Sequence, residues 1–352
     1  MKSREQLLPL DHSEHVNWAA VEQFLRRHIS GLPGEPMQVT PFTAGYSNIT
    51  YLIQIGEWEA VLRRPPFGYI PPKAHDMERE YRILQKMNPV FPLAPQPYVF
   101  SDDRAIMDKH FYVMERKKGV VLDDRLPASF ETIAEVGRIV SETVVDTIVR
   151  LHAIDYQHAG LADIGKPDGY LERQVQGWIK RYHNAKTDDI DQVDEVEKWL
   201  LANIPRSPQP TIVHNDFKVN NMMLSPTDPG KAVGVLDWEM CTIGDPLSDV
   251  GIALAYWTEA GEAETGLTSI TTNPGFMKRR EFAERYAAQS GRDLSDIHYY
   301  LTYAFYKNAV ILQQIYKRWK LGESKDERFS RLLTGIRNLL AQAVKAKRKQ
   351  LV

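Results

Sequence analysis

The stretch that decides the fold covers residues 211–249 and reads TIVHNDFKVNNMMLSPTDPGKAVGVLDWEMCTIGDPLSD. A short apolar run leads into a polar loop that carries Asp216 and Asn221, and a second apolar run ends directly before Asp237. Apolar runs of this length, bounded by polar residues, predict two short strands. We expect the two strands to form a hairpin that brings the three polar side chains to one end.

These side chains suit phosphoryl transfer. One carboxylate can orient a hydroxyl nucleophile, while an Asn and a second Asp hold magnesium that bridges the phosphates of ATP. A metal hydrolase using His214, Asp216 and Asp237 is one alternative, but no further His or Cys cluster lies nearby to complete a transition-metal set. A loop in which His and Asp only form turns is another. The oxygen-only donor set favours a kinase, with Asn221 and Asp237 as the Mg²⁺ ligands.

The motif HNDFKVNN at residues 214–221, followed by VLDWE at residues 235–239, resembles the aminoglycoside phosphotransferase and choline kinase family. A closer resemblance is to the branch that forms the kinase domain of certain acyl-CoA dehydrogenase fusion proteins. Three further motifs are typical of that branch: VLRRPP (61–66), AHDMEREYRIL (74–84) and FYVME (111–115).

The resemblance runs from about Phe42 to Asp249 and implies an α+β, two-lobed protein-kinase-like fold. The first lobe is expected over residues 1–116, with a leading helix, a small five-stranded antiparallel sheet, one helix and a loop for the nucleotide phosphates. The second lobe is larger and mainly helical, covers residues 117–352, and carries the catalytic loop and the acceptor pocket.

Hydrophobic periodicity predicts most of the individual elements. Strands are expected at residues 37–42, 50–55, 59–63, 97–100 and 111–115, and helices at 17–31, 74–86, 133–152, 251–257, 297–319 and 329–348. Residues 160–210 are interpreted as polar and irregular, apart from helical spacing near Trp199. The acidic run from Asp188 to Glu197 could steer a cationic substrate, or could form a solvated helix face.

Four side chains are candidates for the phosphates of the nucleotide. Ser47 and Asn48 lie in a small-residue loop between two strands, which could fold over a triphosphate or form a plain hairpin turn. By resemblance, Arg63 stands where the wider family has a lysine, with Glu80 as its helix partner. Arginine forks to oxygen pairs, so phosphate binding is compatible with the change. Because side chains alternate along a strand, Arg64 is the competing candidate.

The remaining roles come from the same resemblance. Adenine is expected to meet the carbonyl of Glu115 and the amide of Lys117, with Met114 as the apolar wall behind it. Lys218 matches a lysine common in protein kinases and could neutralise the transferring phosphoryl group.

Asp216 is the candidate that orients the attacking hydroxyl and accepts its proton. His214 is expected to fix the loop backbone, and Asp249 to accept hydrogen bonds from the amides of the loop.

Composition sets the limits for these roles. The 352 residues are enough for two lobes, and 43% hydrophobic with 26% charged residues is ordinary for a globular protein. A net charge of −2 gives no case for nucleic acid or a membrane as partner. The single cysteine, Cys241, excludes an internal disulfide, and residues 1–15 lack a signal-peptide core. We therefore expect a cytoplasmic protein.

The sequence predicts an ATP- and Mg²⁺-dependent kinase that phosphorylates a hydroxyl of a small molecule. By resemblance, the acceptor is a hydroxylated acyl compound or its CoA thioester, with an aminoglycoside, a choline-like amine or a homoserine-like substrate as the alternative. A nucleotide-binding pseudokinase acting through protein partners is the alternative of another class, and the presence of Asp216, Asn221 and Asp237 weighs against it. The sequence decides neither the oligomeric state nor the choice of ATP over GTP.

Overall fold

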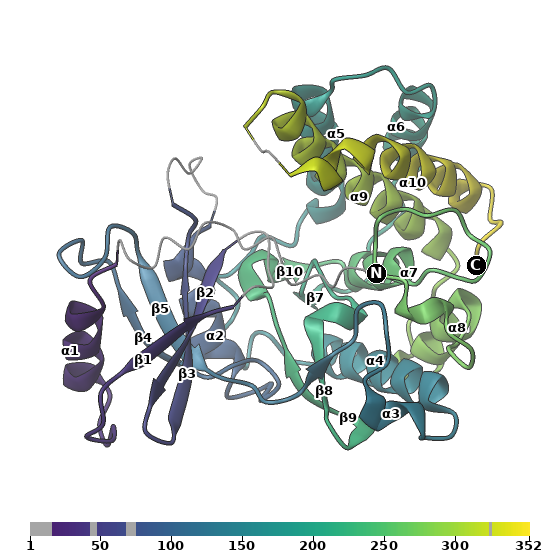
Figure 1. Ribbon diagram of the computed structural model, residues 1–352. Helices are drawn as coiled ribbons and strands as arrows, with labels where there is room; N and C mark the ends of the chain where they lie inside the picture. The colour runs from purple at the N-terminus through teal and green to yellow at the C-terminus, as the bar shows by residue number, and fades with distance from the viewer. Residues whose placement is uncertain (1–15, 43–47, 68–74, 324–325) are drawn as a thin grey trace. The chain divides into compact units, whose positions relative to one another are not determined.

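The computed structural model describes residues 16–42, 48–67, 75–323 and 326–352 (Figure 1). The chain forms two compact units, of which unit 1 ends at Lys118 but also includes Gly234–Glu239, and unit 2 comprises Gly119–Val233 and Met240–Val352. The boundary expected after Arg116 differs from this division by two residues. The segment that contains Asp237 was expected in the second lobe, and its packing groups it with unit 1.

A five-stranded antiparallel sheet forms the centre of unit 1 (Figure 1). In the order β1-β2-β3-β5-β4, its strands are β1 (Gln38–Pro41), β2 (Ile49–Ile55), β3 (Trp58–Arg64), β5 (Phe111–Glu115) and β4 (Pro97–Ser101). Gly56 has a φ of 54°, a left-handed conformation that lets β2 turn directly into β3. These strands match the expected ones to within one residue at every end.

Two helices flank this sheet. Helix α1 (Trp18–His28) is capped by the side chain of Asn17 and buries Val21, Phe24 and Leu25 in one core with residues of β2 and β3. Helix α2 (Met77–Met87) is capped by Asp76, whose carboxylate accepts a hydrogen bond from the backbone amide of Arg79, and it packs on β4 and β5. Each helix covers the sheet with its apolar stripe, as an amphipathic helix does.

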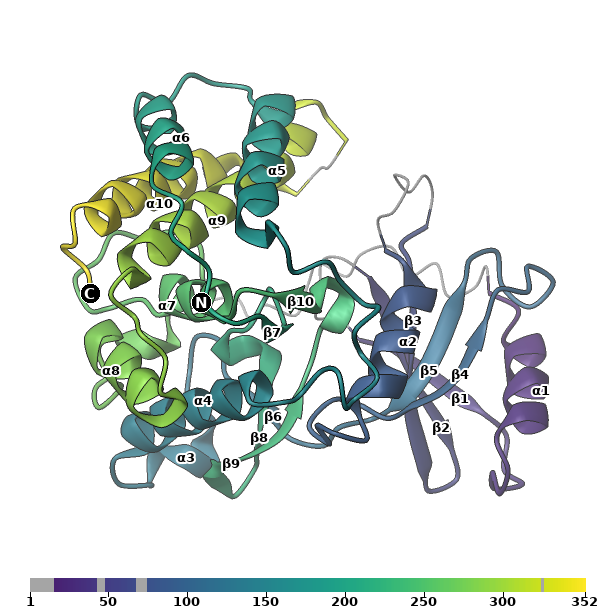
Figure 2. The same ribbon diagram turned by 180° about the vertical axis from the view of Figure 1, so that it is seen from behind.

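Unit 2 is mainly helical (Figure 2). Its helices are α3 (Ala128–Glu131), α4 (Val136–His152), α5 (Tyr170–Ala185), α6 (Gln192–Ala202), α7 (Pro246–Tyr256), α8 (Arg279–Ser290), α9 (Ile297–Lys320) and α10 (Leu332–Lys347). Helix α9 contacts α5, α6, α7 and α10, which explains why most of its aromatic residues are buried core. Within the described residues, no helix is both long and apolar enough to span a membrane.

The strands of unit 2 correct one expectation. The strand β7 (Thr211–Val213) pairs with β10 (Thr242–Gly244), whereas β9 (Asp228–Val235) lies in another sheet with β8 (Met222–Ser225) and β6 (Val120–Val121). The expected hairpin between the apolar run that leads into His214 and the apolar run that ends before Asp237 is therefore wrong. The interpretation overlooked β8, which takes β9 as its partner because only a short turn separates the two.

Helix α5 corrects a second expectation, because it lies in the segment that was interpreted as irregular. Its buried residues, among them Tyr170, Val175, Trp178 and Tyr182, pack against α9. A sequence rich in polar residues did not reveal this face, since its apolar partner comes from a helix more than a hundred positions later.

Candidate active site

In unit 1, one cation meets three carboxylates. The guanidinium of Arg63 donates from Nη2 to Oδ1 of Asp237 at 2.7 Å, and the same nitrogen lies 3.4 Å from Oε2 of Glu239. Its Nε lies 3.2 Å from Oε2 of Glu80 on α2. The Glu80 side chain is 2% exposed and that of Arg63 is 12% exposed, so this pair lies largely out of water.

Strand alternation separates the two neighbouring arginines of β3. Arg63 lies on the face that α2 covers, while Arg64 points to the opposite face, pairs with Asp108 at 2.8 Å and stacks 4.0 Å from the ring of Phe67. The structure therefore brings Arg63, and not Arg64, together with Glu80 and Asp237.

Burial and charge act against each other in this cluster. Burial raises the pKa of Glu80 to about 7, although the Arg63 guanidinium lowers it. Burial disfavours the charge of Arg63, but the carboxylates of Glu80, Asp237 and Glu239 outweigh it and raise the arginine's pKa well above its ordinary value. Arg63 is therefore a permanent cation.

The backbone holds Asp237 in an uncommon conformation at the end of β9. Its φ of 68° lies in the left-handed region, which costs a non-glycine residue of the order of 1 kcal/mol or more. The next residue, Trp238, anchors the turn because its ring is buried and its Nε1 donates to the carbonyl of Val235 at 2.8 Å.

The predicted Asn48 belongs to this cluster, together with two residues that the sequence analysis overlooked, His75 and Arg79. Asn48 donates from Nδ2 to Oε2 of Glu239 at 2.9 Å, and its Oδ1 lies 2.7 Å from Nδ1 of His75. Arg79 of α2 donates to the carbonyl of Glu239 at 2.7 Å. His75 and Arg79 both belong to the AHDMEREYRIL motif (74–84), so the motif could have indicated that they lie near the site. Ser47 lies outside the residues that the structure describes.

Of the three residues expected near adenine, Met114 and Glu115 end β5 and Lys117 follows it. Met114 is buried, and the amide of Glu115 donates to the carbonyl of Gln96 at 2.7 Å. The ammonium of Lys117 lies 2.8 Å from Oε2 of Glu115 and donates to the carbonyl of Pro92 at 2.8 Å. These contacts hold the segment against the loop that precedes β4, while the roles toward adenine stay predictions.

In unit 2, two side chains converge on one oxygen of Asp216. The side-chain Nδ2 of Asn221 donates to Oδ2 of Asp216 and also to its main-chain carbonyl, both at 2.9 Å. Nζ of Lys218 lies 2.8 Å from the same Oδ2. Lys218 also lies 4.7 Å from the ring centroid of Tyr256. Within the described residues, Oδ1 of Asp216 has no hydrogen-bond partner, and the side chain is 19% exposed.

A buried carboxylate on α7 holds the backbone that leads to Asp216. Asp249 is inaccessible to solvent and accepts hydrogen bonds from the amides of His214 at 2.5 Å and Asn215 at 2.6 Å. His152 of α4 lies 3.3 Å from the same carboxylate, and burial lowers its pKa more than Asp249 raises it. A neutral His152 therefore braces Asp249.

Asn215 was overlooked in the sequence although it precedes Asp216. Its Oδ1 accepts from the hydroxyl of Tyr170 at 2.5 Å, its Nδ2 donates to the carbonyl of Met240 at 3.0 Å, and its own carbonyl accepts from Lys307 at 2.6 Å. Tyr170 and Lys307 belong to α5 and α9, and nothing in their local sequence indicates this contact.

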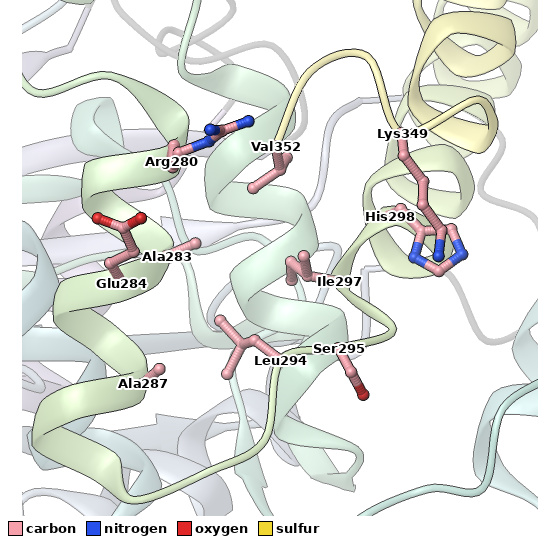
Figure 3. Close-up of a pocket in the computed structure, with 10 residues that line it drawn as sticks. All are labelled: Arg280, Ala283, Glu284, Ala287, Leu294, Ser295, Ile297, His298, Lys349 and Val352. Carbon is pink, nitrogen blue, oxygen red and sulfur yellow. The ribbon is translucent and has the colours of Figure 1, made fainter.

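A separate pocket of about 410 Å³ lies elsewhere in unit 2 (Figure 3). Helix α8 contributes Arg280 and Glu284, the start of α9 contributes His298, and Lys349 comes from the last residues of the chain. None of the predicted site residues lines this pocket.

A sheet unit with a buried Arg–Glu pair, joined to a helical unit with an Asp–Lys–Asn loop, has the architecture of a protein-kinase-like phosphotransferase. The family model described as "Phosphotransferase enzyme family" matches residues 38–297. The chain belongs to this family, so the family prediction made from the HNDFKVNN and VLDWE motifs is confirmed.

Curated relatives carry this region as part of longer proteins. Acyl-CoA dehydrogenase family member 11 of Homo sapiens is 31% identical over 316 residues, which cover 88% of this chain and 40% of that protein. Member 10 of Mus musculus is 31% identical over 319 residues, which cover 87% of this chain and 29% of that protein. The chain thus spans less than half the length of these relatives.

Solved structures confirm the kinase-like fold. A putative aminoglycoside phosphotransferase from Ralstonia eutropha superposes with a TM-score of 0.77 at 28% identity, covering 94% of this chain and 98% of that one. A choline kinase from Cryptosporidium parvum has a TM-score of 0.59 at 12% identity, covering 95% and 96%. An aminoglycoside phosphotransferase in a ternary complex with ADP and hygromycin B has a TM-score of 0.60 at 16% identity, covering 92% and 98%.

Proposed function

We propose that this protein is an ATP- and Mg²⁺-dependent kinase that transfers the γ-phosphoryl group to a hydroxyl of a small molecule. The observation that carries the proposal is the arrangement at Asp216. Lys218 and Asn221 hold its Oδ2, while Oδ1 has no partner within the described part of the chain. A carboxylate held in this way can orient a hydroxyl and accept its proton.

The proposal assigns the nucleotide phosphates to unit 1. Arg63 supplies the cation, and Glu80 holds the guanidinium from the side of α2. Because the guanidinium is planar and forks to oxygen pairs, it can bind phosphate oxygens where the wider family uses lysine. Asn48 contacts Glu239 in the same cluster, which supports its assignment near the phosphates.

The donor chemistry of two residues fits magnesium. Asn221 uses its amide nitrogen for Asp216, which leaves its side-chain carbonyl oxygen for a cation, and Asp237 supplies a carboxylate. Oxygen donors of this kind are those that Mg²⁺ prefers. When bound, the ion would neutralise charge on the phosphates.

During transfer, the acceptor oxygen bonds to the γ-phosphorus as the bond to the β,γ-bridging oxygen of ATP breaks, and ADP leaves. In the proposed mechanism, Asp216 takes the proton of the hydroxyl at Oδ1. The ammonium of Lys218, which lies beside Asp216, offsets negative charge on the transferring group.

For the acceptor, we propose a hydroxylated acyl compound or its CoA thioester. The relatives named as acyl-CoA dehydrogenase family members 10 and 11 support this choice. The acidic run offers a polycationic aminoglycoside less than its full charge, because Asp188 pairs with Lys320 and Glu195 with Lys347.

An ATP-turnover assay tests the proposal. Purified protein is incubated with ATP and Mg²⁺ and with a panel of hydroxy acids, hydroxyacyl-CoA thioesters, choline and aminoglycosides, and phosphorylated product is detected by mass spectrometry. We expect product from the hydroxyacyl group of compounds. Product from an aminoglycoside or choline alone would overturn the acceptor assignment, and ATP binding without product from any acceptor would support the pseudokinase alternative.

A further inference from the structure

Lys307 is a buried cation that the mechanism above does not use. It lies in the middle of α9, its residue is 2% exposed, and its ammonium donates to the carbonyl of Asn215 at 2.6 Å. The same nitrogen lies 5.5 Å from the ring centroid of Trp178 on α5, within the range of a cation–π contact.

A lysine at this buried position lowers the stability of unit 2 unless its charge is compensated. An ammonium taken out of water needs compensation, and an apolar side chain of the same length would fill the space without that cost. Burial lowers the pKa of Lys307 to about 8, against the carboxylates of Asp216 and Asp249, which raise it. At neutral pH the side chain therefore still carries its proton.

The acceptor of this hydrogen bond belongs to the peptide that leads into Asp216. The carbonyl of Asn215 and the amide of Asp216 form one planar peptide unit, so fixing one end orients the other. Lys307 holds the carbonyl end, and Nδ1 of His214 accepts from the amide end at 3.3 Å.

Asn215 needs such contacts because of its backbone. Its φ of 65° is left-handed, a conformation that asparagine tolerates better than most residues but that still costs energy. Its amide, its side-chain oxygen and its side-chain nitrogen are bound by Asp249, Tyr170 and Met240. Lys307 completes this set by binding the fourth polar group, and it does so with a charged donor.

We propose that Lys307 is a positioning residue for phosphoryl transfer, whose ammonium fixes the Asn215–Asp216 peptide plane and thereby aims the carboxylate of Asp216. The inference rests on the proposed function of Asp216. The inference adds Lys307 to the proposed site, although it lies on α9, 91 positions after Asp216 in the chain.

Three variants test the inference. Lys307→Met keeps an unbranched stem and removes the donor, and Lys307→Gln keeps a donor at the end of a shorter stem. Lys317→Met is the matched control, because Lys317 lies on the same helix and also donates to a main-chain carbonyl, that of Asn184 at 2.7 Å, at a more exposed place.

In the turnover assay, kcat of Lys307→Met should fall about 100-fold, since a small misplacement of a reacting group costs about that much, while KM for ATP stays within about twofold. Lys307→Gln should recover part of the loss, and Lys317→Met should match the parent. In hydrogen exchange, Lys307→Met should speed exchange in residues 211–223 and leave α9 unchanged, because the core that surrounds α9 is intact.

Two results would overturn the inference. One is a Lys307→Met protein that keeps kcat within about threefold of the parent, below the effect expected of a misplaced base. The other is exchange that rises equally in α5, α7 and α9, which would show a general loss of packing. The exchange arm needs no acceptor, so it tests whether Lys307 fixes the Asn215–Asp216 peptide even if the parent phosphorylates nothing on the panel, a result that would count against the proposed function. Should Lys307→Met fail to fold, Lys307→Gln is compared with Lys317→Met by the same two measurements.

Discussion

Replacement of Asp216 by asparagine is a sharp test of the proposed chemistry, because the structure predicts how the new amide will be oriented. Both neighbours of Oδ2, the ammonium of Lys218 and the amide nitrogen of Asn221, are donors. They select the amide oxygen for that position. The amide NH₂ must then occupy the place of Oδ1, where it presents protons to the acceptor hydroxyl and cannot accept one.

The size of the effect follows from what is lost and what is kept. Loss of a general base lowers a rate by about 10²–10⁴-fold, which corresponds to about 3–5 kcal/mol in the activation barrier. The fold should hardly change, because both hydrogen bonds to the Oδ2 position remain. Only the ion pair with Lys218 is weakened, at a cost of about 0.5 kcal/mol for a partly exposed pair.

The assay compares kcat, KM for ATP and the free energy of unfolding in urea for the parent and two variants. Asp146→Asn is the matched control, since Asp146 also accepts hydrogen bonds from a cation and an amide, those of Arg285 at 2.9 Å and Gln289 at 2.8 Å. We expect Asp216→Asn to lose kcat with ATP affinity unchanged, and Asp146→Asn to keep kcat. Turnover by Asp216→Asn within about tenfold of the parent would refute the assignment of Asp216 as the base.

Four further predictions concern the residues around the two loops. Asp237→Ala should abolish the enhancement of ATP binding by Mg²⁺ in calorimetric titrations, and an enhancement equal to that of the parent would argue against Asp237 as a ligand. Arg63→Ala should weaken ATP binding at least about tenfold, and Arg63→Lys much less. Arg64→Ala should leave ATP binding unchanged, since Arg64 points to the opposite face of β3, and equal losses of affinity in Arg63→Ala and Arg64→Ala would contradict this. Asp249→Ala should lower the free energy of unfolding of unit 2 by about 3 kcal/mol, because two buried amides lose a charged acceptor, and a loss below about 1 kcal/mol would not fit. The pKa of Glu80 in the folded protein is about 7, above its ordinary value, so its contribution to the free energy of unfolding is full below pH ~4.5 and is lost as the pH rises through 7. The loss should amount to about 3 kcal/mol in total, and the free energy of unfolding of Glu80→Gln should lack this dependence on pH.

The local elements of unit 1 followed from the sequence to a large extent. Alternating apolar residues predicted β2, the turn at Gly56 predicted that β3 follows it, and apolar residues at helical spacing predicted α1. These patterns can be recognised because each element buries one face against a core of its own unit. Its apolar residues therefore recur at the period of a strand or a helix within a few neighbouring positions.

The elements that the sequence analysis missed depend on partners far along the chain. Helix α5 is polar on much of its surface and gains its packing from α9, and the pairing of β7 with β10 skips over β8 and β9. A strand of three or four residues has too short a pattern to specify its partner, so only the packed chain decides the pairing.

The site shows the same division. Asp216, Lys218 and Asn221 lie within six residues, so the sequence could group them: Asp216 and Asn221 by their residue types and spacing, and Lys218 by its resemblance to a lysine of protein kinases. Which arginine of β3 meets Glu80 depended on the phase of the strand, and the structure decided in favour of Arg63.

The sequence by itself determined the family and the two-part α+β architecture, and it predicted the short loop that carries Asp216, because motifs and periodicity are properties of neighbouring residues. Only the tertiary structure decided that Lys307 and Asn215 meet, since a lysine in an apolar helix carries no local sign of its acceptor. The free energy of a buried charge depends on the groups that surround it in space, and α9 acquires those groups only when the chain has packed.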